Sequence, residues 1–277
     1  MRHLEGQIQT SDGLTLYSQS WLPDDQPKAV IAFCHGQSDH SGRYANLVNA
    51  LIPAGYALFM ADLRGHGKSP GIRGHIMSWE DYRRDMTALM EHAQQAFPNL
   101  PHFFGGHSMG GLIALHIALD NPPGYRGVIA SAPALQFAFE PPAALVTLVR
   151  FLSRAAPRTI ISNQLDASGL THDQAVVETY KADPLVHGKV TPRAAVELTT
   201  TQADTLARAG QTNLPLLILH GSADPIIAAD GSREYYEKAS STDKTLKIYE
   251  GLYHEIFNEL EKKQVLDDLI NWLDAHL

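Results

Sequence analysis

Short, almost wholly apolar runs recur along the chain and constrain its fold more than any other feature of the sequence. They occupy residues 29–36, 56–63, 102–108, 126–133 and 214–221, and a more polar run at residues 244–251 closes the series. A strand with one solvated face alternates apolar and polar residues, whereas a strand covered on both faces is apolar throughout. The runs therefore predict a mostly parallel sheet that is buried between layers of helices.

Segments with helical patterns separate these runs. They cover residues 44–55, 78–97, 109–119 and 260–277. Ser78 and Asp81 form the S-x-x-D variant of a capping box at the start of the second segment. The third segment is apolar on nearly every side, which is typical of a buried helix. Strands and helices in alternation predict a doubly wound α/β fold, to which residues 3–10 and 14–22 add an antiparallel hairpin.

Residues 134–210 break this alternation. They contain several helical patterns, including residues 143–156 and 194–209, and no convincing pair of strands. Ligands of open α/β sheets bind beyond the carboxyl ends of the strands, so an insertion between two strands can cover that site. We therefore expect a core formed by residues 1–133 and 211–277, and a helical cap, or lid, formed by residues 134–210.

The charge and the apolar segments restrict the partners and the location of the protein. A formal net charge of −8 argues against a nucleic-acid partner. The single cysteine, Cys34, lies in an apolar run, where a buried side chain is a better interpretation than a reactive thiol. The N-terminus lacks the basic and apolar segments of a secretory signal. We therefore expect a cytoplasmic protein, with transient contact between the cap and a membrane surface as an open alternative.

One serine stands at the junction of a strand pattern and a helix pattern. Gly106, Ser108 and Gly110 satisfy G-x-S-x-G directly after the apolar run at residues 102–108. At such a sharp turn the serine backbone is strained, and a side chain at either glycine would collide with the neighbouring chain. This context predicts that Ser108 is a nucleophile. A glycine- and serine-rich turn that binds phosphate is the alternative.

A serine nucleophile needs a base, and the base needs a third group that holds it. On this topology the order along the chain is serine, then an acid, then histidine, with the last two on loops after late strands. Asp224 and His254 occupy those two positions, and we predict that they complete the triad. Asp230 is a weaker candidate because it opens a helical pattern, where N-capping accounts for it. Other histidines at strand ends do not follow the acid: His35, His107 and His220.

Attack of a serine on a carbonyl group produces a negatively charged oxygen, the oxyanion, which requires hydrogen-bond donors. The backbone N–H of Met109, at the start of the helix after Ser108, is one candidate. The second is the backbone N–H of Gln37, in the loop after the first apolar run, where Gly36 allows a close backbone approach.

Two further motifs lack a residue that they require. Residues 65–69 end like a phosphate-binding P-loop, but Asp62 stands where that motif needs a glycine. Residues 254–258 begin like a zinc-binding HExxH motif, but Asn258 replaces the second histidine. No other cluster of metal ligands is apparent in the sequence. We therefore expect hydrolysis without a metal or other cofactor.

Five blocks of the sequence together resemble the monoacylglycerol lipase and lysophospholipase group of the α/β-hydrolase superfamily. They are HGQSDHSGRY, DLRGHGKSPG, GGHSMGG, HGSADPI and GLYHEIFNE. The resemblance runs from about Gly6 to the C-terminus and is weakest in residues 134–185. It implies the α/β-hydrolase fold, with a mostly parallel eight-stranded sheet, flanking helices and a helical cap after the sixth strand. It also implies a triad of Ser108, Asp224 and His254 and an oxyanion hole of the Gln37 and Met109 amides.

The resemblance implies a small-molecule lipid ester as substrate, and first of all a monoacylglycerol. Lysophospholipase or other carboxylesterase activity, and an aminopeptidase-like or acyltransferase activity on the same triad, remain alternatives. Epoxide and haloalkane chemistry would need a carboxylate where Ser108 stands. A non-catalytic binding protein of this fold is disfavoured because no triad member is missing. The apolar residues of the cap fit either packing on the core or a wall for an alkyl chain.

Overall fold

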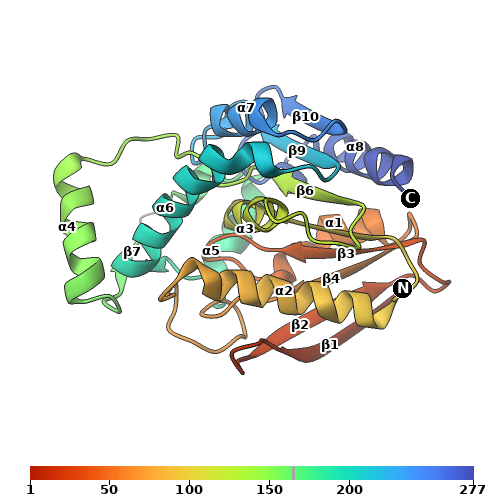
Figure 1. Ribbon diagram of the computed structural model, residues 1–277, viewed down its shortest axis with the longest axis horizontal. Helices are drawn as coiled ribbons and strands as arrows, with labels where there is room; N and C mark the ends of the chain where they lie inside the picture. The colour runs from red at the N-terminus through yellow and green to blue at the C-terminus, as the bar shows by residue number, and fades with distance from the viewer. Residues whose placement is uncertain (164–165) are drawn as a thin grey trace.

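An eight-stranded sheet forms the centre of the molecule, in the order β1-β2-β4-β3-β5-β6-β9-β10 (Figure 1). This computed structural model describes residues 1–163 and 166–277. The strands are β1 (Arg2–Gln9), β2 (Thr15–Leu22), β3 (Ala29–Cys34), β4 (Tyr56–Ala61), β5 (His102–His107), β6 (Gly127–Ser131), β9 (Leu216–Gly221) and β10 (Lys244–Tyr249). Strand β2 pairs antiparallel with β1 and β4, and all other neighbours are parallel. The predicted hairpin and mostly parallel sheet are confirmed.

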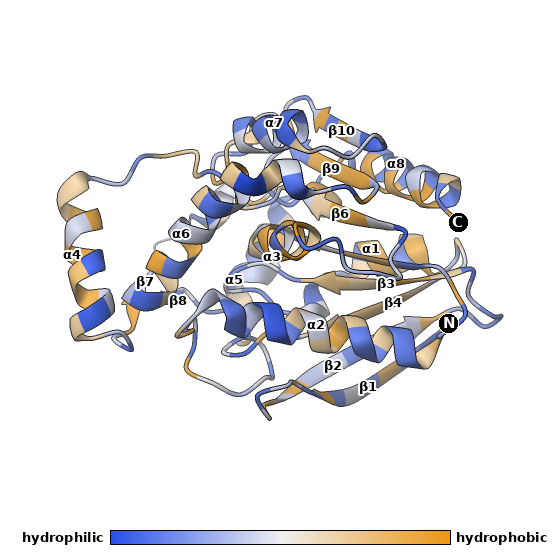
Figure 2. Cartoon of the chain, viewed as in Figure 1, coloured by the Kyte–Doolittle hydropathy of each residue, from blue (hydrophilic) through white to orange (hydrophobic). Residues whose placement is uncertain are grey.

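Helices cover both faces of the sheet. Those of the core are α1 (Ala45–Leu51), α2 (Trp79–Ala96), α3 (Met109–Ala118), α7 (Ala229–Lys238) and α8 (Lys262–Ala275). In β3, Val30 and Ala32 belong to one apolar core with α2 and α3, whereas Ile31 and Phe33 belong to a second core with α1 and α8. Both faces of this strand are therefore buried, which is why its sequence is apolar throughout. Figure 2 shows the same apolar character in the central strands and all around α3.

The start of α2 follows the predicted capping box. The Ser78 hydroxyl accepts a hydrogen bond from the Glu80 backbone N–H, and the Asp81 carboxylate accepts one from the Ser78 backbone N–H. These bonds satisfy amide groups that have no partner within the helix. The hydrogen bonds of Ser78 and Asp81 also fix the point where the chain enters α2. This helix packs on the sheet beside α3.

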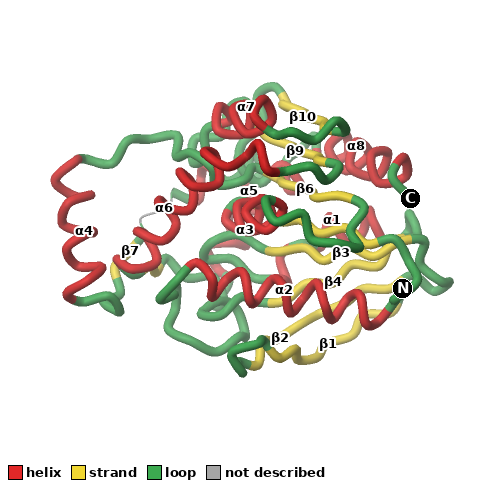
Figure 3. Tube along the Cα trace, viewed as in Figure 1, coloured by secondary structure: helices red, strands yellow, loops and turns green. Residues whose placement is uncertain are grey.

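The chain between β6 and β9 is mostly helical (Figure 3). It contains α4 (Ala143–Ala155), β7 (Ile161–Ser162), α5 (Gln174–Ala182), β8 (Lys189–Val190) and α6 (Pro192–Arg208). The helical insertion after the sixth strand is thus present. The expectation that residues 134–210 hold no strand pair is wrong, because β7 and β8 pair antiparallel. Two-residue strands leave no periodic pattern in a sequence. Residues 164–165 of the expected cap lie outside the described residues.

Helix α4 stands at the edge of the molecule, with α6 between it and the sheet (Figure 1). Of its thirteen residues only Ser153 is buried. Within the described parts of the chain, no helix has both the length and the apolar character that crossing a membrane requires.

Candidate active site

Ser108 lies at the turn between β5 and α3, in a backbone conformation that residues other than glycine rarely adopt. Its φ is 55° and its ψ is −118°. A Cβ on Gly106 would lie 2.3 Å from the carbonyl carbon of Gly110, and a Cβ on Gly110 would lie 2.3 Å from the carbonyl oxygen of Cys34. Contacts this short are not tolerated, so glycine is required at both positions. The predicted steric role of the two glycines is confirmed.

The structure brings Ser108, His254 and Asp224 together from three different loops. The Ser108 Oγ lies 2.9 Å from Nε2 of His254, and Nδ1 of the same ring lies 2.6 Å from Oδ2 of Asp224. Asp224 follows β9 and His254 follows β10, both at the carboxyl edge of the sheet. Since the Asp224 carboxylate only accepts, His254 carries a proton on Nδ1 and presents Nε2 to the serine hydroxyl.

Asp224 is surrounded by donors that favour its charged form. Burial raises the pKa of this carboxyl, but His254 and the hydrogen bonds from His220 and His254 outweigh the burial and hold the pKa of Asp224 below its ordinary value. Its other oxygen, Oδ1, accepts from the backbone N–H groups of Ile226 and Ile227 at 2.8 and 3.0 Å. A fixed anion at this position holds the ring of His254 and can stabilise its cation.

The two amides proposed for the oxyanion lie beside the serine. Gln37 and Met109 line the same cavity as Ser108, and a Cβ on Gly36 would lie 3.2 Å from the Cβ of Ser108. Among the described residues, neither amide N–H donates to a backbone carbonyl in a turn, loop or cap. Ser38 next to Gln37 has a φ of 63°, so the loop after β3 turns sharply here. Such a pair of unpaired N–H groups is suited to a developing negative charge.

The competing residues of the sequence have other surroundings. His107 packs its ring 4.7 Å from the ring of His254, and burial lowers the pKa of His107 to about 3, with a further contribution from His254. Asp230 lies in the first turn of α7 with an exposed side chain, whereas Asp224 and His254 are buried. We expected Asp230 to be the N-cap of a helix, and this is wrong, because Ala228 is the N-cap of α7. Cys34 is buried, as predicted.

A cavity of about 810 Å³ adjoins Ser108, and its walls come from the loops at the sheet edge and from residues 134–210. One part of the wall is apolar and includes Phe137, Leu145, Val149, Leu198 and Ile226. Another part is charged and includes Asp39, Arg43 and Glu255. The cavity therefore offers different surroundings to the two ends of an amphiphilic molecule.

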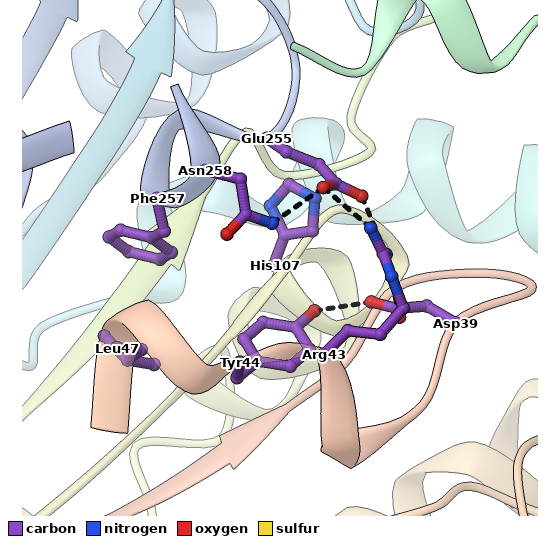
Figure 4. A pocket seen from close by; sticks show the side chains of 8 residues that line it. All are labelled: Asp39, Arg43, Tyr44, Leu47, His107, Glu255, Phe257 and Asn258. Atoms are coloured by element: carbon purple, nitrogen blue, oxygen red, sulfur yellow. Dashed lines mark hydrogen bonds and ion pairs between the residues drawn. The ribbon is translucent and has the colours of Figure 1, made fainter. Parts of the chain in front are cut away.

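The charged wall continues into a small polar pocket, drawn in Figure 4. Arg43 lies between two carboxylates, at 3.0 Å from Asp39 and at 2.8 and 3.0 Å from the two oxygens of Glu255. The hydroxyl of Tyr44 donates to Asp39, and the side-chain amide of Asn258 donates to Glu255. Burial raises the pKa of Asp39, but Arg43, His35 and His40 together outweigh the burial and keep that pKa below the ordinary value.

This pocket and its buried ion pairs were not predicted from the sequence. Asp39 and Arg43 lie in the block after β3, and Glu255 follows His254 directly, so all were quoted in the blocks that carried the resemblance. The available signal was the presence of charged residues next to two catalytic loops. A charged residue in a loop is usually solvated, and only the packing of the two loops shows that these charges are paired and buried.

The sheet order and the helical segment after the sixth strand define the α/β-hydrolase fold. A family model described as "Serine aminopeptidase, S33" matches residues 25–261. The chain belongs to this family of α/β-hydrolases, and the resemblance expected from the sequence blocks is confirmed by the relatives below.

Three relatives are similar over nearly the whole chain. A monoacylglycerol lipase from Mycolicibacterium smegmatis is 37% identical over 96% of this chain and 95% of its own length. A monoglyceride lipase from Rattus norvegicus is 32% identical over 96% of this chain and 89% of its own. The crystal structure of a Paleococcus ferrophilus monoacylglycerol lipase is 33% identical, with a TM-score of 0.86 over 95% of this chain and 99% of that chain.

Proposed function

We propose that this protein is a serine hydrolase that cleaves monoacylglycerols to a fatty acid and glycerol. The observation that carries the proposal is the hydrogen-bonded series Ser108–His254–Asp224 beside a cavity with one apolar and one charged wall. The names of the relatives support the same substrate class.

The reaction proceeds in two halves through an acyl-serine. His254 takes the proton of Ser108 while Oγ attacks the ester carbonyl, and the Gln37 and Met109 amides stabilise the oxyanion. The protonated His254 then gives its proton to the departing glycerol oxygen. Water, deprotonated by the same ring, attacks the acyl-serine, and the fatty acid leaves as Ser108 recovers its proton. Losing either oxyanion donor would cost about 3–4 kcal/mol of transition-state stabilisation.

The two walls of the cavity support a single-chain ester with a small neutral head group. An alkyl chain fits against the apolar wall, and the glycerol hydroxyls find donors and acceptors at the charged wall. A second acyl chain would have to lie against the charged wall, where Asp39, Arg43 and Glu255 offer an alkyl chain no apolar surface. A phosphate head group would meet two carboxylates, those of Asp39 and Glu255, for one guanidinium. Both arguments rank monoacylglycerols above diacylglycerols and lysophospholipids.

Residues 134–210 act in this proposal as the cap that the substrate must pass. Helix α4 exposes several large apolar side chains, with Leu148 at 51% and Phe151 at 66% of their full exposure. Residues 134–162 also carry three arginines, Arg150, Arg154 and Arg158, for one acidic residue, although the whole chain is acidic. Apolar and basic side chains on one helix favour transient contact with an anionic membrane surface. The cytoplasmic location of the protein stays a prediction.

A hydrolysis panel tests the substrate class. The purified protein is compared on a long-chain monoacylglycerol, the matching diacylglycerol, the matching lysophospholipid and a short p-nitrophenyl ester. We expect the highest kcat/KM for the monoacylglycerol and the lowest of the three lipids for the diacylglycerol. A preference for the diacylglycerol would overturn the substrate assignment and leave the serine mechanism intact.

A further inference from the structure

We propose that His220, which lies outside the triad, is a positioning residue that orients the Asp224 carboxylate for His254, and that Ser232 fixes the orientation of His220. This inference rests on the proposed serine mechanism and extends it by two residues. The residues concerned lie in and after β9, in the loop that carries Asp224, and in the first turns of α7.

His220 and His254 share one oxygen of Asp224. Oδ2 lies 2.6 Å from Nδ1 of His254 and 3.2 Å from Nε2 of His220. The side chains of His220 and Asp224 are both fully buried, with 0% of their surface exposed. Water therefore cannot replace the contribution of His220, and the second lone pair of Oδ2 depends on this ring.

The tautomer of His220 follows from its neighbours. Its Nε2 faces two acceptors, Oδ2 of Asp224 and, at 3.0 Å, the backbone oxygen of Ile227, so Nε2 carries a proton. Its Nδ1 lies 2.7 Å from the Ser232 hydroxyl in α7. The rotation of the imidazole is thus fixed at both nitrogens. The series Ser232–His220–Asp224–His254–Ser108 connects α7 with the nucleophile.

The hydrogen bond from His220 restricts the rotation of the Asp224 carboxylate. Its Oδ1 is fixed by the amides of Ile226 and Ile227, which belong to the same loop as Asp224. The bond from His220 comes from strand β9, inside the sheet. It anchors Oδ2 to β9 and leaves the other lone pair of this oxygen for His254. Loss of the anchor lets the carboxylate rotate away from the ring that it has to hold.

The test compares His220→Leu with His220→Gln. Leucine removes the donor, whereas the glutamine amide can place an N–H near the position of Nε2. We expect His220→Leu to lower kcat on a p-nitrophenyl ester about 10- to 100-fold, the range for a lost hydrogen bond to a charged group, with KM nearly unchanged. We expect His220→Gln to recover most of kcat. His102→Leu is the matched control for loss of a buried histidine from a strand, because His102 lies at the end of β5 that is far from Ser108, and it should keep the wild-type kcat.

The outcomes separate the two proposals. If wild-type protein hydrolyses the ester and His220→Leu matches its kcat, or His220→Gln is as slow as His220→Leu, the positioning role is wrong and the triad stands. If wild-type protein itself shows no Ser108-dependent hydrolysis, the proposed function fails. Should His220→Leu not fold, Ser232→Ala decides: the account expects a several-fold lower kcat at unchanged KM, and a wild-type kcat contradicts it.

Discussion

The turn that carries Ser108 and the helix α4 differ in almost every physical respect. The turn is held in a strained conformation by glycines that admit no side chain, and its neighbours are buried. Helix α4 exposes its large apolar residues and buries only Ser153. The backbone around Ser108 is thus constrained by steric contacts on every side, whereas most side chains of α4 are free of such contacts. Four substitutions test this contrast.

The largest effect is expected at the nucleophile. Ser108→Ala removes the attacking oxygen and leaves the turn intact, so we expect kcat on a p-nitrophenyl ester to fall about 10⁵-fold or more. Thermal unfolding should change little. Undiminished turnover by a folded Ser108→Ala protein would contradict the mechanism.

The next effect concerns the backbone around the nucleophile. Gly110→Ala places a Cβ 2.3 Å from the carbonyl oxygen of Cys34, and we expect a loss of about 3 kcal/mol or more in the free energy of unfolding. At Gly188→Ala the new Cβ meets, among the described residues, only the Oδ1 of Asn163, at 3.4 Å, and stability should change by less than about 0.5 kcal/mol. Urea denaturation measures both. Equal stability of the two variants would remove the steric contrast between core and cap.

A third substitution alters the cavity without touching the triad. Leu198→Trp enlarges a side chain of α6 on the apolar wall, so a long acyl chain should lose space. We expect kcat/KM for a long-chain monoacylglycerol to fall about tenfold, equivalent to about 1.4 kcal/mol, with a much smaller change for a short ester. Leu198→Met, of similar volume, is the control. An equal loss of kcat/KM on both substrates would show that the substitution disturbs the fold and not the binding of the acyl chain at the apolar wall.

The smallest effect on the fold is expected in α4. Phe151→Asp changes an exposed side chain, so the free energy of unfolding should change by less than about 0.5 kcal/mol. Binding to vesicles of anionic phospholipid, measured by cosedimentation, should weaken several-fold because an apolar contact is lost and a like charge is added. Gln264→Asp, at an exposed position of α8, is the charge-matched control. Equal binding by both variants would exclude α4 as the membrane contact.

The core was predictable because local patterns and chain order specify it. Strands buried on both faces are continuous apolar runs, and the glycines around Ser108 record a steric requirement that holds wherever the turn occurs. Asp224 and His254 could be placed because each follows a strand. The short pair of β7 and β8 could not be predicted, since two residues form no pattern. The bonds from Arg43 to Asp39 and Glu255, and from His220 to Asp224, were also missed, because such partnerships depend on how loops pack in space.

Labelling with a pair of alkyl fluorophosphonates, one with a long and one with a short chain, tests the division between core and cap most directly. Peptide mass spectrometry locates the adduct, and the rate of labelling measures the fit of the chain. The account predicts that both reagents modify Ser108 alone and that the long-chain reagent reacts faster. Modification of another residue, or no adduct on a protein that still hydrolyses esters, would contradict it.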